Sequence, residues 1–281
     1  MTVLVTGSKG MIGSQVVNGL LKAGYDVVGI DRVDDNRSMD HYRYYKTDLS
    51  DKEMLQKIVR ENQAERLIHL AALAHTAGEN DLSWDRYYHV NVACAKNVFQ
   101  AAGENPVLFI STVDVFGFYD GKQPVSGSTE LHPVTNYGKS KALAEQECMK
   151  LAHYTIFRFS PVYTDVIKRD IRKRYYLKYP AIAYQIGKGT HYEILNVNLA
   201  VAAMVDWCKE GPRNEIRIIK DDTPMWTPDY IHAEKAAGRA KVVLKFPKWL
   251  ITLGYHVLHA VPGENEKTYL LNKAVYPLRS E

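Results

Sequence analysis

Short apolar runs alternate with amphipathic segments through the first half of the chain. The runs fall at residues 3–5, 27–30, 67–70, 107–110 and 155–159 and predict buried strands. Between the first two runs, apolar residues recur at helical spacing from Ile12 to Leu21, and Gly24 follows. Strands that alternate with helices need right-handed crossovers. The pattern therefore predicts an α/β fold, a doubly wound parallel sheet of the Rossmann type.

The alternation changes near residue 163. A basic stretch spans residues 168–178, an apolar helix is predicted near 199–207 and a strand at 216–219. We predict a Rossmann domain over residues 1–163 and a smaller, mixed substrate lobe over 164–281. Residues 197–220 of this lobe are expected to pack back on the Rossmann sheet. No low-complexity linker separates the two parts, so we expect them to pack together.

The composition is that of an ordinary globular protein. Hydrophobic residues make up 46% and charged residues 24% of 281, which excludes the disordered, collagenous and disulfide-rich classes. The net charge of +4 does not indicate nucleic-acid binding. Three widely spaced cysteines and no visible secretory signal predict a reduced, cytoplasmic protein without a metal motif. The apolar stretch 249–261 is too short to span a bilayer; we expect burial in the lobe, with contact to a membrane surface as the alternative.

A glycine-rich loop, residues 6–13, follows the first predicted strand directly, and the first helix begins inside it. Glycines allow the backbone to approach a pyrophosphate closely, and the helix N-terminus offers free N–H groups. Asp31 ends the second strand, where its carboxylate could bind a ribose diol. An acid there repels a 2′-phosphate and favours NAD over NADP, although the adjacent Arg32 weakens this preference.

A second constellation combines a hydroxyl, a phenol and an amine. Tyr137 and Lys141 stand four residues apart at the start of a predicted helix, so they share one face. The ammonium could lower the pKa of the phenol and make it a usable base. A Ser or Thr hydroxyl at a neighbouring strand end could complete a site around a substrate alcohol.

Together these motifs resemble the extended short-chain dehydrogenase/reductase family, and within it the NAD-dependent nucleotide-sugar epimerases and dehydratases. The resemblance covers roughly residues 1–163 and includes segments 48–49, 69–72, 90–92 and 111–117. It implies NAD as cofactor and Thr112, Tyr137 and Lys141 as catalytic residues. The cofactor-binding residues that the motifs and the resemblance indicate are Gly7, Gly10, Met11, Ile12, Gly13, Asp31, Arg32, Asp48, Leu49, Leu70, Ala71, Ala72, Ser111, Tyr137, Lys141 and Ser160.

Three departures from the family pattern bear on the reaction. Sugar dehydratases carry Thr-Asp-Glu where this chain has Thr-Val-Asp at 112–114, which disfavours dehydration. Residues 158–165 lack the family's Asn and Gly-Pro, and residues 187–192 lack the Arg that grips the diphosphate in epimerases. The basic stretch 168–178 could replace that Arg or could be a solvated helix. Candidate substrate contacts are Ala74, His75, Thr112, Asp114 and Arg172.

The resulting hypothesis is an NAD-dependent nucleotide-sugar epimerase that acts at C4 through a transient keto sugar. The alternatives are an NAD(P)-dependent dehydrogenase or reductase with net hydride transfer and a non-catalytic NAD sensor. We expect no metal, nucleic acid or membrane span. A homodimer is predicted through helices near 83–102 and 137–152, because their apolar residues exceed what one sheet-facing stripe needs. Those residues are Tyr87, Ala95, Val98, Phe99, Leu143 and Met149.

Overall fold

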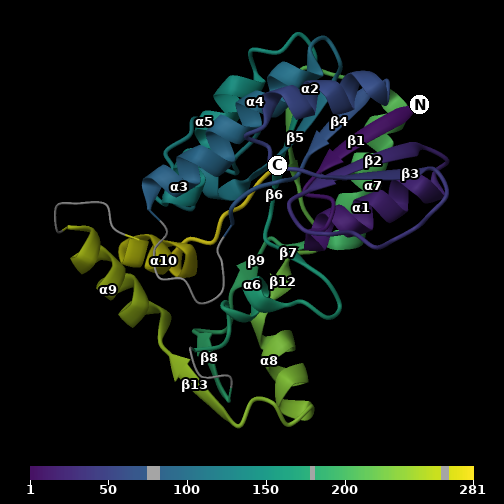
Figure 1. The fold of residues 1–281 in the computed structure, drawn as a ribbon. Helices are drawn as coiled ribbons and strands as arrows, with labels where there is room; N and C mark the ends of the chain where they lie inside the picture. The colour runs from purple at the N-terminus through teal and green to yellow at the C-terminus, as the bar shows by residue number, and fades with distance from the viewer. Residues whose placement is uncertain (75–82, 178–180, 261–265) are drawn as a thin grey trace.

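A seven-stranded parallel sheet forms the centre of the molecule (Figure 1). The computed structural model describes residues 1–74, 83–177, 181–260 and 266–281. The strand order is β11-β6-β5-β4-β1-β2-β3, and the sequence prediction of a Rossmann-type α/β fold is confirmed. The strands are β1 (Thr2–Thr6), β2 (Asp26–Asp31), β3 (Tyr42–Lys46), β4 (Arg66–His69), β5 (Val107–Thr112), β6 (Tyr154–Phe159) and β11 (Glu215–Ile219).

Strand β3 did not appear among the apolar runs. It has the sequence Tyr-Arg-Tyr-Tyr-Lys and lies at the edge of the sheet, where its residues are only partly buried or exposed. An edge strand needs no continuous apolar run, because one of its sides has no strand neighbour. The pattern of hydrophobic residues therefore did not predict β3.

Helices cover both faces of the sheet. Helices α1 (Met11–Lys22) and α7 (Val197–Glu210) pack on one face, where Val17, Leu20 and Met204 are fully buried. Helices α2 (Lys52–Glu61), α4 (Cys94–Ala102) and α5 (Asn136–Cys148) pack on the other. Helix α3 (Trp84–Tyr88) continues through a π-helical turn, η1 (His89–Ala93), into α4, and a 3-10 turn, η2 (Val113–Phe116), follows β5. Two apolar layers thus enclose the sheet, as strands buried on both faces require.

The chain leaves the sheet after β6 and returns to it through α7 and β11. Strand β11 pairs in parallel with β6 and forms the edge opposite β3. This return falls at residues 197–219, within the segment for which the sequence predicts it. The division into two domains near residue 163 remains a prediction.

The C-terminal lobe consists of short two-stranded pieces and helices, with a small core that includes Ile171, Tyr175 and Ile231. Its strands are β7 (Val162–Tyr163), β8 (Ile182–Ile186), β9 (His191–Tyr192), β10 (Leu195–Asn196), β12 (Met225–Trp226) and β13 (Val242–Phe246). Its helices are α6 (Arg169–Arg172), α8 (Thr227–Ala236), α9 (Lys248–His259) and α10 (Glu266–Val275). In Figure 1, α9 and β13 lie at the margin of this lobe, away from the large sheet.

Two expectations about apolar residues are wrong. Along residues 249–260, the described part of stretch 249–261, only Tyr255 is buried, because α9 packs on one side alone. Conversely, Tyr87, Ala95, Val98 and Phe99 are buried within the chain itself. Ala95, Val98 and Phe99 supply the core between α4 and the sheet, and Tyr87 packs against Leu73 and Tyr137. These four residues are therefore not exposed surplus, and the homodimer itself remains a prediction. In the described part of the chain, no helix combines the length and the apolarity needed to cross a bilayer.

Candidate active site

The glycine loop between β1 and α1 is a close-packed backbone structure. The N–H of Gly7 donates to the carbonyl of Ile30 over 2.8 Å, and Gly7 adopts a φ of +70° that favours glycine. A Cβ atom at Gly13 would lie 2.0 Å from the carbonyl oxygen of Gly7. No side chain caps α1 in the described structure. Its first N–H groups are therefore available to an anion in front of the loop.

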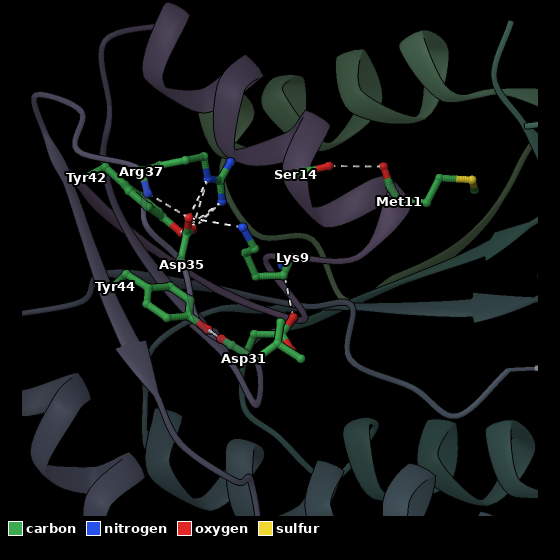
Figure 2. A network of polar contacts seen from close by, with 9 residues as sticks. Lys9, Met11, Ser14, Asp31, Asp35, Arg37, Tyr42 and Tyr44 are labelled. Carbon is green, nitrogen blue, oxygen red and sulfur yellow. Dashed lines mark hydrogen bonds and ion pairs between the residues drawn. The ribbon is translucent and has the colours of Figure 1, made fainter. Parts of the chain in front are cut away.

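Asp31 at the end of β2 is tied to this loop (Figure 2). One carboxylate oxygen accepts the backbone N–H of Lys9 over 2.9 Å, and the other accepts that of Arg32 over 2.7 Å. The acid therefore stands next to the loop, as a ribose-binding residue requires.

A second acid nearby escaped the sequence analysis. Asp35 accepts hydrogen bonds from Lys9 Nζ over 3.1 Å, from the Arg37 guanidinium over 2.6 Å and from the Tyr42 hydroxyl over 3.0 Å (Figure 2). The hydrogen bond from Arg37 is the largest cause that holds the pKa of Asp35 well below its usual range. The charges of Lys9 and Arg37 are thus engaged by Asp35. Only the fold could reveal this, because Lys9 and Asp35 are brought together by the pairing of β1 with β2.

Thr112, Tyr137 and Lys141 meet beside the glycine loop. Thr112 ends β5 and accepts the N–H of Asp114, and Tyr137 lies in the first turn of α5. Thr135 caps α5, accepting the Gly138 N–H over 2.9 Å. A hydrogen bond joins Thr112 to the Tyr137 side chain. The sequence prediction that these residues share one site thus has the geometry it needs.

The electrostatics of this group differ from the expectation. Burial, and after it the charge of Asp114, raise the pKa of Tyr137, whereas the hydrogen bond with Thr112 lowers it. Burial lowers the pKa of Lys141 to about 7. Its ammonium lies 4.0 Å from the centre of the Phe109 ring. Sharing a helix face was therefore not sufficient for Lys141 to lower the pKa of the phenol, because the lysine side chain turns toward β5.

The C-terminal helix α10 contributes a partly buried ion pair to the site. Asp114 accepts hydrogen bonds from Lys273 Nζ over 2.6 Å, from the Tyr269 hydroxyl over 2.9 Å and from the Thr135 hydroxyl over 2.5 Å. Burial acts to raise the pKa of Asp114, but Lys273 and these hydrogen bonds outweigh it and lower the pKa. Tyr269 and Lys273 carried no motif that could have identified them.

One cleft of about 980 Å³ joins these parts. The predicted site residues that line it are Gly7, Gly10, Met11, Ile12, Gly13, Leu70, Ala72, Ala74, Ser111, Thr112, Asp114, Tyr137, Lys141 and Ser160. The buried hydroxyls of Ser111 and Ser160 have no hydrogen-bond partner within the described chain. A bound molecule could satisfy them.

Other predicted residues lie outside the wall of the cleft. Ala71 packs behind the loop, where its backbone nitrogen would lie 2.8 Å from a Cβ at Gly7. Asp48 accepts the N–H of Ser50, and the carbonyl of Leu49 accepts from Asn97. His75 lies outside the described residues.

The basic stretch divides between two directions. The Arg172 guanidinium lies 3.9 Å from Glu234 and does not line the cleft. Lys173 and Arg174 do line it, and the Arg174 guanidinium lies 4.6 Å from the centre of the Tyr192 ring. A short helix, α6, turns the neighbouring cations to different sides.

The far wall of the cleft is mainly apolar and aromatic. It includes Leu177, Phe246, Ile251, Leu270 and Leu271. In the described residues, no three His, Cys, Asp or Glu side chains meet as metal ligands.

The chain is similar in sequence to one known protein family and to several curated proteins. The model of the NAD dependent epimerase/dehydratase family matches residues 3–208. The UDP-glucose 4-epimerase of Haemophilus influenzae is 35% identical over 161 residues, which are 52% of this chain and 47% of that protein. The UDP-glucose 4-epimerase of Drosophila melanogaster is 27% identical over 278 residues, 87% of this chain and 73% of its own. In several such alignments the chain spans about half the length of the curated relative.

Solved structures share the fold. The UDP-glucuronic acid 4-epimerase of Bacillus cereus, determined in complex with NAD, superimposes on this chain with a TM-score of 0.70 at 20% sequence identity. The superposition covers 88% of this chain and 87% of that protein. The Thermus thermophilus UDP-glucose 4-epimerase complex with NAD gives a TM-score of 0.67 at 22% identity, over 88% and 86%. The architecture therefore extends beyond the Rossmann part into the C-terminal lobe.

Proposed function

The chain belongs to the NAD dependent epimerase/dehydratase family, and we propose that it is an NAD-dependent epimerase of a nucleotide sugar that acts at C4 through a transient keto sugar. The observation that carries this proposal is the meeting of Thr112, Tyr137 and Lys141 in one cleft with the glycine loop. A hydroxyl and a phenol joined by a hydrogen bond are suited to move a proton to and from a sugar hydroxyl.

The residues of the loop end fit a dinucleotide. The Gly13 position has no room for a Cβ, and the hydroxyls of Ser111 and Ser160 are buried in the cleft without a partner. Asp31 is positioned to accept a ribose diol. When bound, NAD supplies the acceptor and donor of the hydride. Lys141 would hold the nicotinamide end.

Tyr137 is the proposed acid and base. Because the pKa of Tyr137 is raised, the phenol keeps its proton at neutral pH. The hydrogen bond from Thr112 lowers this pKa and thereby favours removal of the proton. Asp114 opposes that step through its charge, and Lys273 offsets Asp114 at 2.6 Å. The chain thus sets the proton affinity of the phenol with groups from β5, α5 and α10.

The substrate diphosphate requires a cationic anchor. Lys173 and Arg174 line the cleft, and we assign them this role in place of the arginine that segment 187–192 lacks. Arg172, engaged near Glu234, is the weaker candidate.

A second function has specific support from the far wall of the cleft. The apolar side chains there, including Phe246, Ile251 and Leu271, favour a less polar alcohol than a sugar. The corresponding activity is a dehydrogenase or reductase with net hydride transfer.

Assembly and location are also proposals. Trp84, Tyr88 and Met149 remain exposed on the helices for which a dimer is predicted and support a homodimer through this surface. The three cysteines are buried and unbridged, which supports the predicted cytoplasmic location.

The test is the balance of the cofactor. We expect the purified chain with NAD to interconvert C4 epimers within a panel of UDP-, GDP- and dTDP-sugars without net formation of NADH. Accumulation of NADH in step with an oxidised product would instead establish the dehydrogenase. Binding of NAD without turnover of any sugar or alcohol would contradict both enzymatic proposals.

A further inference from the structure

Helix α9 presents to solvent an apolar surface that the described chain leaves uncovered. Trp249, Leu250, Leu253, Val257 and Leu258 each keep between 42% and 66% of their surface exposed. Trp249, Leu253 and Val257 follow at four-residue intervals, so they form one stripe along the helix. Leu250 lies beside them on the same side. We call these four residues the α9 stripe.

The opposite side of α9 is the one that packs. Tyr255 is buried and its hydroxyl accepts a hydrogen bond from Asn272 of α10. Ile251 lines the cleft, and the His259 ring lies 5.3 Å from that of Phe118. Helix α9 is thus apolar around most of its circumference, but the protein uses only one side.

The segment of sequence that contains the stripe is cationic. From Lys235 to Ala260 the sequence contains five Lys or Arg residues and no Asp or Glu. Lys241, Lys245 and Lys248 are exposed and make no ion pair with any described residue. Strand β13, which leads into α9, also exposes Val242 and Leu244 at alternate positions of one strand face.

The charge, length and composition of this segment indicate which kind of partner it binds. A symmetric contact with a second copy would bring the lysines of one α9 segment opposite those of the other. A helix of 12 residues is about 18 Å long and cannot cross a hydrocarbon core of about 30 Å. Exposed Trp and Leu flanked by Lys, with no acid, are typical of helices that lie in the plane of a membrane interface.

We propose that the α9 stripe and the lysines of β13 and α9 bind the surface of an anionic lipid bilayer. The helix lies parallel to the bilayer with Trp249, Leu253 and Val257 inserted at the level of the headgroups. Lys241, Lys245 and Lys248 contact the anionic lipids. This binding is independent of the proposed reaction, since no residue of the stripe lines the cleft.

The experiment measures co-sedimentation of the full chain with phosphatidylcholine vesicles, with and without phosphatidylglycerol, in the absence of any substrate. We expect binding to the anionic vesicles that weakens with salt. Leu253→Glu/Val257→Glu should lower the partition coefficient at least about tenfold. Replacement of the three lysines by Gln should lower it about fivefold per lysine. Trp249 gives a second readout, the blue shift of fluorescence that Trp249→Phe removes.

The matched control is Met54→Glu/Leu199→Glu, which changes two exposed apolar residues of α2 and α7 in the same way. It should bind vesicles like the unmodified chain. Circular dichroism and NAD binding of all variants report on folding. Two results would overturn the proposal. One is that the unmodified chain fails to bind anionic vesicles at low salt. The other is that Leu253→Glu/Val257→Glu converts a dimer to a monomer without changing vesicle binding.

Discussion

The two ends of the cleft are built by different means. At the loop end, contacts run through the backbone and between neighbouring strands, as between Gly7 and Ile30 or Asp31 and Lys9. At the far end, contacts join side chains that are distant in sequence, as between Asp114 and Lys273, 159 residues apart. Apolar side chains line much of the far wall, together with Lys173 and Arg174.

This difference indicates how the two ends can change. A backbone cradle depends on the absence of side chains, so almost every substitution at Gly13 disturbs it. A wall of side chains can change its shape and polarity with one substitution at a time. Substrate preference is therefore expected to vary at the far end while the loop end stays constant.

The largest effect is expected where the two ends meet. Tyr137→Phe removes the proposed acid and base and should lower turnover at least about a hundredfold, while NAD affinity stays nearly unchanged. Steady-state kinetics and a binding titration measure the two quantities. If most activity remains, the proton passes through another group and the assignment of the site is wrong.

The contrast in packing can be tested with two glycines. Gly13→Ala places a Cβ 2.0 Å from the Gly7 carbonyl and should reduce the free energy of unfolding by about 1–3 kcal/mol, with loss of NAD binding. Gly254→Ala in α9 meets no atom within 4 Å and should increase it by about 0.5–1 kcal/mol. Urea unfolding curves measure the free energy of unfolding of both variants. Equal tolerance at both positions would mean that the loop end is not the rigid one.

The link from α10 to the catalytic group can be broken at Lys273. Lys273→Met leaves the Asp114 carboxylate without its cation and should destabilise the protein by about 1–3 kcal/mol. Because the charge of Asp114 raises the pKa of Tyr137, the limb of the pH–rate profile that requires the phenolate should move to higher pH. Lys273→Arg serves as the control that keeps the charge. An unshifted profile would show that Asp114 does not act on Tyr137.

The smallest effect concerns cofactor preference at the loop end. Asp31→Ala/Asp35→Ala removes two carboxylates and frees the Lys9 ammonium and the Arg37 guanidinium, which Asp35 holds, for a 2′-phosphate. The ratio of NADP to NAD affinity should rise about tenfold, as expected for one new hydrogen bond to a charged group. Asp34→Ala is the matched control, since this exposed acid pairs with Lys46 instead. A ratio equal to that of the control would assign the preference to other residues.

The sequence predicted the features that depend on neighbouring residues. The strands of 3–5 and 27–30, the glycine loop and the spacing of Tyr137 and Lys141 are local patterns, and the family that they resemble is confirmed. The alternation of apolar strands with amphipathic helices is compatible with few fold classes other than a parallel sheet covered by helices on both faces.

The sequence did not predict the features that depend on contacts between distant residues. Asp35 and Lys273 carry no motif, and their roles arise only when β1 meets β2 and when α10 reaches η2. The direction of the Lys141 side chain and the exposure of α9 were also beyond the pattern. A run of apolar residues states how much surface can be buried, but not which element will cover it.

The sequence by itself thus determined the Rossmann sheet, the loop and the identity of the candidate catalytic residues, because backbone conformation and local spacing fix them. Only the tertiary structure decided the surroundings that set their pKa values, the wall that faces the substrate and the side of α9 that stays open to solvent. The physical reason is that desolvation and charge act through space, and folding brings together groups that the chain keeps apart.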